Sequence, residues 1–272
     1  MKHLLISFAI LLIACTPEPE KINEVKTSNE KEVKKAEPGK KLVRDSVELD
    51  SGIKITWTKN GTGDNLETGD VIGLDYKVYL ENGKLVESNE KMKKPFPFMV
   101  GFGMQTKGWD IALKELKVGD EVSVFVPSEL ARGKKGIEGL VPPNSNNILQ
   151  LKVVNKLPFE EDKEGNKVWM LEQSKLHKTL FNDKNTVSFH AMASTVSNPF
   201  YINTYRKGTP FEFKMKDAGV VPGLKQSLLG KKRADRMYVL IPAKNAYGSE
   251  GLKGLVQPNE DLFYNVYIMD VF

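Results

Sequence analysis

The chain repeats itself at a constant offset of 115 residues, and no insertion breaks the register across the strongest matches. Phe96 recurs as Phe211, and Gly108 recurs as Gly223. The same offset relates further positions of distinctive residue type: Phe98 to Phe213, Pro127 to Pro242, Ala131 to Ala246, Gly133 to Gly248, Gly139-Leu140-Val141 to Gly254-Leu255-Val256, and Pro143-Asn144 to Pro258-Asn259. A period this long predicts two tandem globular domains rather than solenoid units, because about 100 residues can bury a core of their own.

The first residues have the pattern of an export signal. Lys2 precedes an apolar run at residues 4–14, which is shorter than the roughly 20 apolar residues of a membrane-spanning helix. The run ends in Leu12-Ile13-Ala14-Cys15, which resembles the lipobox of bacterial lipoproteins. This resemblance implies a lipoprotein signal peptide over residues 1–14 and lipidation of Cys15, hence a lipid-anchored protein on the periplasmic or surface side of a bacterial cell envelope. The alternative is an ordinary cleaved signal followed by an incidental cysteine.

Residues 15–45 are predicted to be the lipidated cysteine and a flexible charged tether. The segment is rich in Lys, Glu, Pro and Ser, so it cannot bury enough apolar surface to order itself. Cys15 is the only cysteine, which excludes an intramolecular disulfide. The net charge is +5, with lysines and glutamates interleaved. We expect a solvated surface, with affinity for anionic lipid as the alternative, and no nucleic-acid partner for an exported lipoprotein.

Copy 1, residues 46–157, combines two hydrophobic periods. Apolar side chains at every second position predict strands at residues 72–78, 96–100, 122–126 and 149–153. Apolar residues spaced i, i+3, i+4 and i+7 predict one face of a short helix: Trp109, Ala112, Leu113 and Leu116. We expect this helix to end at Gly119-Asp120. Copy 2, residues 158–272, has the corresponding pattern, so the predicted fold class is α+β: two domains, each an antiparallel β-sheet wrapped around one short α-helix.

The offset changes only near the start of each copy. Trp57 matches Trp169 at an offset of 112, which predicts about three extra residues in an early loop of copy 2. The charged segment 156–166 contains Gly165 and is the predicted joint between the copies.

Four motifs occur in order in copy 1, and counterparts of three of them occur in copy 2. Those of copy 1 are Lys94-Pro95-Phe96-Pro97-Phe98-Met99, Gly108-Trp109, Ala131-Arg132-Gly133 and Gly139-Leu140-Val141-Pro142-Pro143. Those of copy 2 are Val220-Val221-Pro222-Gly223-Leu224, Ala246-Tyr247-Gly248 and Gly254-Leu255-Val256. These motifs resemble those of the FKBP-type peptidyl-prolyl cis–trans isomerases, over nearly all of residues 46–272. The resemblance implies two tandem FKBP-like domains.

The chemistry of this family suits these residue types. Rotation about an X–Pro bond crosses a barrier of about 18–20 kcal/mol, because the planar amide loses its resonance when it twists. A dry aromatic pocket favours the less dipolar twisted state, and binding has to be stronger there than in the ground state. We expect no cofactor and no metal, since the chemistry needs neither and His3, His177 and His190 have no ligand spacing. For His190 we expect a place on a strand surface.

In copy 1 the resemblance implies a proline pocket whose floor is Trp109. The residues it identifies as catalytic are Tyr76, Glu87, Phe96, Thr106 and Trp109, with the Thr106 N–H binding a substrate carbonyl. The further substrate-binding positions are Val86, Gln105, Arg132, Leu140, Val141 and Leu149.

Copy 1 departs from the family pattern at several of these positions. Arg132 replaces a loop tyrosine that donates a hydrogen bond, and Gln105-Thr106 replaces an apolar pair. Val86 replaces a large aromatic residue, and Glu87 replaces an aspartate. These changes predict a wider and more polar pocket that keeps its tryptophan floor.

Copy 2 departs at nearly complementary positions. Ala191 stands for Tyr76, and Ile202 stands for Glu87. We expect an apolar cleft with a loop tyrosine, either wider than that of copy 1 or filled by rearrangement. Its implied substrate-binding residues are Tyr201, Phe211, Val220, Val221, Leu224, Tyr247, Leu255 and Tyr264.

The sequence therefore favours a peptidyl-prolyl cis–trans isomerase that assists the folding of exported proteins, with the activity in copy 1. Its expected partners are proline-containing unfolded or exported polypeptides, and the membrane through the N-terminal lipid. Two alternatives remain open. One is a non-catalytic chaperone or peptide-binding lipoprotein with degenerate pockets, and the other is a surface lipoprotein that uses the fold only as a scaffold.

Overall fold

The structure of the protein is a computed structural model that describes residues 45–272. The predicted signal peptide (1–14), Cys15 and the tether as far as residue 44 lie outside the described residues. Within residues 45–272, every helix is too short or too polar to cross a lipid bilayer.

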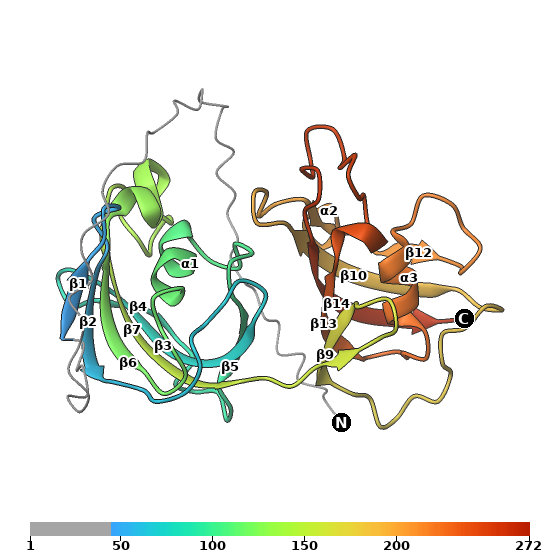
Figure 1. Cartoon of the computed structure of the whole chain (residues 1–272), viewed down its shortest axis with the longest axis horizontal. Helices are drawn as coiled ribbons and strands as arrows, with labels where there is room; N and C mark the ends of the chain where they lie inside the picture. Colours follow the sequence, from blue (N-terminus) through green and yellow to red (C-terminus); the bar gives the residue numbers. More distant parts are fainter. Residues whose placement is uncertain (1–44) are drawn as a thin grey trace, which may run out of the picture.

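Each copy forms a seven-stranded antiparallel sheet, and the two sheets lie side by side, joined by the segment between β7 and β8 (Figure 1). In copy 1 the strand order is β1-β2-β6-β7-β3-β4, and β5 pairs with β3. The helix α1 packs against the sheet. The elements of copy 1 are β1 (Ser46–Glu48), β2 (Lys54–Lys59), β3 (Val71–Leu80), β4 (Leu85–Ser88), β5 (Phe96–Met99), α1 (Lys107–Leu113), β6 (Glu121–Val126), the 3₁₀ turns η1 (Ser128–Leu130) and η2 (Gly133–Lys135), and β7 (Asn147–Lys156).

Copy 2 repeats this topology, with strand order β11-β10-β14-β13-β9-β8 and β12 paired with β10. The predicted α+β class is therefore confirmed. The four-residue helix α2 is an addition that the sequence pattern did not predict. The elements of copy 2 are β8 (Glu160–Glu161), β9 (Lys167–Glu172), β10 (Val187–Ser194), β11 (Ile202–Asn203), α2 (Thr204–Lys207), β12 (Phe211–Phe213), α3 (Pro222–Leu228), β13 (Arg236–Ile241), the 3₁₀ turn η3 (Ala243–Asn245) and β14 (Leu262–Val271).

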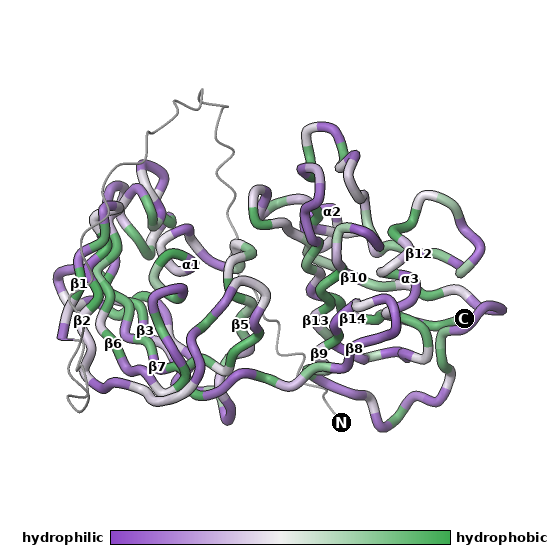
Figure 2. Tube along the Cα trace, viewed as in Figure 1, coloured by the Kyte–Doolittle hydropathy of each residue, from purple (hydrophilic) through white to green (hydrophobic). Residues whose placement is uncertain are grey.

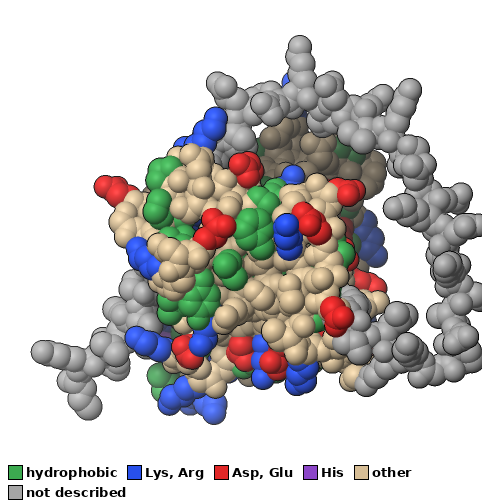
Figure 3. Space-filling model, turned by 90° about the vertical axis from the view of Figure 1, so that its left-hand side faces the viewer, with side chains coloured by type: hydrophobic (Ala, Val, Ile, Leu, Met, Phe, Trp, Pro, Cys, Tyr) green, Lys and Arg blue, Asp and Glu red, His purple; other side chains and the backbone are tan. Residues whose placement is uncertain are grey.

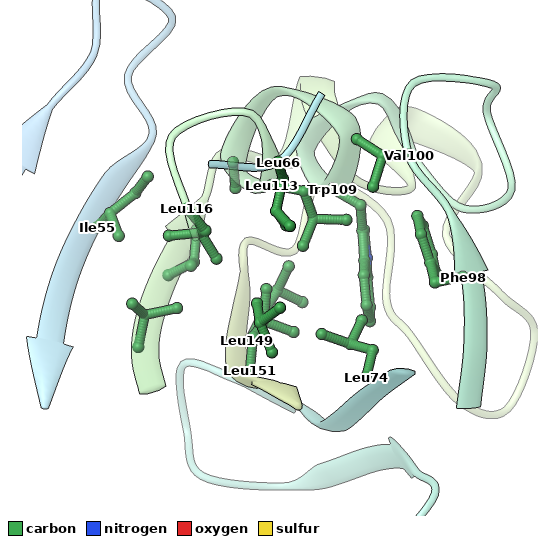
Figure 4. Close-up of a cluster of buried hydrophobic side chains, with 14 of the residues drawn as sticks. Ile55, Leu66, Leu74, Phe98, Val100, Trp109, Leu113, Leu116, Leu149 and Leu151 are labelled. Atoms are coloured by element: carbon green, nitrogen blue, oxygen red, sulfur yellow. The ribbon is translucent and has the colours of Figure 1, made fainter. Parts of the chain in front are cut away.

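The core of copy 1 lies between α1 and the concave face of the sheet (Figure 4). Trp109 and Leu113 extend from the helix toward Leu74 and Leu149 on the strands. The helix ends at Leu113, earlier than predicted, because the backbone after it forms hydrogen bonds outside the helix. The Leu116 carbonyl accepts from Leu66 N–H at 2.9 Å instead of continuing the helical pattern. Leu116 is still fully buried, so the predicted apolar face is correct although the helix boundary is not.

The predicted match between Trp57 and Trp169 is wrong by one residue. Thr56 lies opposite Ser123 in copy 1, whereas Trp169 lies opposite Tyr238 in copy 2. Ser123 and Tyr238 are related by the offset of 115, so Trp169 corresponds to Thr56 at an offset of 113. Copy 2 therefore has two extra residues before β10 rather than three. A shift of one residue moves a strand side chain to the opposite face of the sheet, and Trp169 accordingly faces away from the core of copy 2.

The convex face of the copy 2 sheet packs against copy 1. Seven buried residues form this contact: Val71, Met99 and Phe102 of copy 1, and Trp169, Tyr238, Leu240 and Phe263 of copy 2. Hydrophobic stretches run along the strands of both copies, whereas many connecting loops are hydrophilic (Figure 2). The face of the molecule in Figure 3 carries basic and acidic side chains interspersed, in keeping with the solvated surface predicted from composition.

Candidate functional site

Three elements of copy 1 bring four aromatic rings together. Trp109, on α1, stacks on Phe98 of β5 with ring centroids 5.7 Å apart. Its other neighbour is Tyr76 of β3, edge-on at 5.4 Å, and Tyr76 meets Phe96 edge-on at 6.0 Å. Edge-to-face and offset contacts at these distances are the favourable aromatic geometries. The result is an aromatic cup in which Trp109 is nearly buried, with 5% of its surface exposed, and Phe96 and Tyr76 are half-buried.

A hydrogen bond fixes the open side of this cup. Tyr76 Oη donates to Glu87 Oε1 at 2.8 Å, linking β3 to β4. Burial raises the pKa of the Tyr76 hydroxyl, and the negative charge of Glu87 raises it further. Tyr76 is therefore a neutral hydrogen-bond donor at physiological pH, and Glu87 retains a second carboxylate oxygen at the rim.

Asn89 is a supporting residue that sequence reasoning missed. It is buried, accepts from Tyr76 N–H at 2.7 Å and donates to the Leu74 carbonyl at 3.0 Å. These bonds hold the chain after β4 against the strand that carries Tyr76. A polar residue just beyond a strand is the only signal the sequence offered for it.

The loop before α1 supplies the polar edge of the site. Arg132 Nη2 donates to Gln105 Oε1 at 3.1 Å, so two of the departures from the family pattern contact each other. Thr106 is the N-cap residue of α1, and its carbonyl accepts from Trp109 N–H at 2.9 Å. The Thr106 N–H has no hydrogen-bond partner among residues 45–272.

The remaining predicted positions of copy 1 support the site from two sides. Val86, Leu140 and Val141 belong to a small apolar cluster with Leu80 and Ile137. Val141 is buried there, whereas Val86 and Leu140 are half-buried. Leu149 is 1% exposed and belongs to the core beneath the aromatic cup, so it supports the site without lining its surface.

In copy 2 the corresponding space is filled by tyrosines. Tyr264 stands where copy 1 has Leu149, is 2% exposed, and packs in one cluster with Ala191 and Leu224. The hydroxyls of Tyr201 and Tyr247 hydrogen-bond each other at 2.5 Å. Burial raises the pKa of Tyr201, and its contact with Tyr247 raises it further. Of the two outcomes expected for copy 2, the structure shows filling by rearrangement.

The other predicted residues of copy 2 are divided between surface and core. Phe211 and Leu255 are exposed, with 38% and 45% of their surface accessible. Val221 and Leu224 are buried, and Val220 is half-buried. His190 lies on the outer side of β10, where Nδ1 is 2.9 Å from Thr204 Oγ1.

Two hollows lie outside the aromatic cup. An open groove of about 700 Å³ lies on the outer face of the copy 1 sheet and is lined by charged residues such as Lys77, Glu121 and Lys152. Of the four aromatic residues of the cup, Tyr76 is the one that also lines this groove. A smaller cleft of about 100 Å³ lies between the copies. Phe96 and Gln105 line this second cleft, so it adjoins the aromatic site.

The sequence matches the family described as FKBP-type peptidyl-prolyl cis-trans isomerase over residues 63–154 and 178–269. The chain belongs to this family, and it contains two of its domains in tandem. This assignment confirms the resemblance drawn from the motifs.

Several named proteins resemble parts of the chain. FK506-binding protein 3 of Yarrowia lipolytica is 40% identical over 120 residues, 44% of this chain and 28% of that protein. Peptidyl-prolyl cis-trans isomerase FKBP10 of Homo sapiens is 25% identical over 209 residues, 76% of this chain and 35% of that protein. The chain thus spans about a third or less of the length of these relatives. FK506-binding protein 1 of Saccharomyces cerevisiae is 32% identical over 107 residues, 39% of this chain and 94% of that protein.

Solved structures give similar matches. The crystal structure of the 3 FKBP domains of wheat FKBP73 is 25% identical, covers 82% of this chain and 96% of its own, and has a TM-score of 0.39. The crystal structure of AtFKBP13 is 28% identical, covers 42% of this chain and 99% of its own, and also has a TM-score of 0.39.

Proposed function

We propose that the protein is a peptidyl-prolyl cis–trans isomerase whose active site is the aromatic cup of copy 1, and that it assists the folding of exported proteins. The observation that carries this proposal is the joint placement of Tyr76, Phe96 and Trp109, with Tyr76 bonded to Glu87. Copy 2 lacks the counterparts of Tyr76 and Trp109 and has filled the space.

The proposed mechanism uses binding alone. The proline ring rests on Trp109, where the apolar surroundings disfavour the dipolar planar amide and so favour its twisted form. The Thr106 N–H, which has no hydrogen-bond partner among residues 45–272, binds the carbonyl that flanks the prolyl bond. The Tyr76–Glu87 pair presents a carboxylate at the rim that accepts a substrate N–H. No covalent bond is made or broken.

The test is prolyl exchange in a short peptide, followed by NMR with the full chain and with Trp109→Leu. We expect wild-type protein to accelerate exchange and Trp109→Leu to lose at least about tenfold of kcat/KM, equivalent to about 1.4 kcal/mol of transition-state stabilisation. A thermal unfolding transition like that of the wild-type protein would show that the variant is folded. No acceleration by the wild-type chain would reject the proposal.

A second function, a chaperone that holds polypeptides without turnover, is favoured by one observation. Arg132 is engaged with Gln105 where the family has a tyrosine donor, so this part of the proposed mechanism is altered. The holding function predicts that the chain suppresses aggregation of an unfolded client equally well with and without Trp109→Leu. Loss of suppression in that variant would favour the isomerase pocket as the binding site.

We also propose that the chain is anchored by lipid on Cys15, which places it at the cell envelope near newly exported polypeptides. The support is the sequence Leu12-Ile13-Ala14-Cys15 after a short apolar run. Expression with radiolabelled palmitate tests this directly. Label should appear in wild-type protein and be absent from Cys15→Ser, and equal labelling of both would reject the anchor.

A further inference from the structure

We infer that copy 2 supplies a binding subsite for the substrate of copy 1: the cleft between the copies accepts a large apolar side chain of an extended polypeptide whose proline occupies the aromatic cup. This inference rests on the proposed function of the copy 1 site. It gives copy 2, whose own pocket is filled, a direct part in substrate recognition.

The two walls of the cleft are held in a fixed relation by a built interface. Tyr238 Oη of copy 2 donates to the Pro97 carbonyl of copy 1 at 3.0 Å. Ser194 Oγ donates to the Phe102 carbonyl at 2.7 Å in a buried position, and Phe102 packs on Phe263 at 5.9 Å. Because these buried hydrogen bonds and apolar contacts join the two copies, they hold the two walls of the cleft in place.

One close approach places the copy 2 wall beside the copy 1 site. Gly103 has a φ of +66°, and a Cβ at this position would lie 2.3 Å from Pro199 Cβ. The loop that carries Pro199 is itself fixed, because Glu260 accepts from Ser197 N–H at 2.7 Å and from Ser197 Oγ at 2.9 Å. Phe200, which follows Pro199, therefore lines the cleft from a loop whose backbone is held in place.

The lining is suited to an apolar side chain. Phe96, Met104 and Gln105 line the cleft from copy 1, and Met192, Phe200 and Phe263 line it from copy 2. Phe200 is 48% exposed, a large fraction for an aromatic residue beside an active site. The cleft has a volume of about 100 Å³, which gives room for one side chain. Thioethers and aromatic rings adapt well to varied apolar groups.

Continuity with the aromatic cup identifies the occupant. Phe96 contacts Tyr76 on one side and lines the cleft on the other. Gln105 likewise lines the cleft and accepts from Arg132 at the polar edge of the site. A chain that leaves the cup past Phe96 and Gln105 reaches the cleft directly. Unfolded polypeptides expose apolar side chains close to proline, and the cleft recognises that combination.

The test compares two fluorescein-labelled peptides that share a central Ala-Pro, one with phenylalanine and the other with serine at the flanking positions. Binding is measured by anisotropy with the full chain. We expect wild-type protein to prefer the phenylalanine peptide by about tenfold in Kd. Phe200→Asp should reduce this preference to about twofold or less, because a charge in the cleft opposes apolar binding.

The matched control is Leu176→Asp, which changes a residue of copy 2 that is 87% exposed and does not line the cleft. It should keep the wild-type preference, and Phe200→Ser provides a milder second variant. Trp109→Leu should weaken binding of both peptides and leave their ratio unchanged. If wild-type protein failed to accelerate prolyl exchange, the proposed isomerase function would be rejected. The ratio of the Kd values for the two peptides could still be measured, so the two failures are distinguishable.

An unchanged ratio in Phe200→Asp, or equal weakening of both peptides, overturns the subsite. The cleft would instead serve a second copy of the chain if Phe200→Asp lowered the sedimentation mass and left the peptide ratio unaltered, and that result also overturns the inference.

Discussion

The two copies use the concave and convex faces of their sheets differently. Copy 1 keeps an aromatic site on the concave side of its sheet and exposes polar residues on the convex side. Copy 2 fills its concave side with Tyr264 and uses its convex side to pack on copy 1. One fold thus carries the candidate catalytic site in copy 1, whereas in copy 2 it packs by its convex face against copy 1.

Matched positions on the convex faces show which substitutions produce this difference between the copies. Ser123 of β6 becomes Tyr238 of β13, and Lys77 of β3 becomes Met192 of β10. In copy 1 these positions line an open charged groove. In copy 2 Tyr238 is 2% exposed at the interface. A few substitutions on one sheet face therefore decide whether that face meets water or protein.

The largest effect on stability should come from this interface. Tyr238→Ala removes a buried ring and its hydrogen bond to Pro97, and should cost about 3–5 kcal/mol of unfolding free energy, as buried aromatic truncations do. The matched Ser123→Ala should change it by no more than about 0.5 kcal/mol. Denaturant unfolding of both variants measures the contrast. Similar losses at the two positions would contradict the difference between the faces.

Gly103→Ala should have the next largest effect. The added Cβ would meet Pro199 at 2.3 Å, so the copies must move apart, at a cost of about 2 kcal/mol. Gly83→Ala is the control, because Gly83 also has a positive φ but has no atom within 4 Å of the added Cβ. It reports backbone strain alone, about 1 kcal/mol. If Gly103→Ala lowered the unfolding free energy no more than Gly83→Ala, the close approach of Gly103 to Pro199 would not contribute to the stability of the interface.

A smaller effect separates the tyrosines of the two concave sides at alkaline pH. Burial raises the pKa values of Tyr264 and Tyr76 in the folded chain, whereas an unfolded tyrosine ionises near pH 10. The unfolded state therefore loses these protons first, so stability that is present below about pH 10 falls as the pH rises further.

Tyr264→Phe should flatten this fall more than Tyr76→Phe, because Tyr264 is the more deeply buried. Denaturant midpoints measured from neutral pH to beyond the tyrosine range provide the comparison. Equal slopes in the two variants would indicate that the copy 2 tyrosines are not specially buried.

Much of the fold and of the copy 1 site could be predicted from the sequence. The change of period around Trp109 identified the helix, and the resemblance to the family implied that Tyr76, Glu87 and Phe96 belong to one site. Trp169 could not be placed, because the face of a strand residue depends on its register and a slip of one reverses it. Asn89 was missed because a side chain that bonds a neighbouring backbone leaves no periodic pattern.

The interface had a signal that periodicity alone did not reveal. Residues 237–241 are apolar without interruption, whereas residues 122–126 alternate until Phe125. An unbroken apolar strand is buried on both faces. Comparing the two copies strand by strand for lost alternation would have predicted that copy 2 packs by its convex face.

The central claim is that one copy isomerises and the other does not, and one pair of variants tests it most directly. Phe96→Ala and Phe211→Ala change the same residue type at matched positions. We expect Phe96→Ala to lower kcat/KM for prolyl exchange by about tenfold or more, the loss of about 1.4 kcal/mol of transition-state binding. Phe211→Ala should stay within about twofold of wild type. Equal losses, or a larger loss at Phe211, would contradict the account.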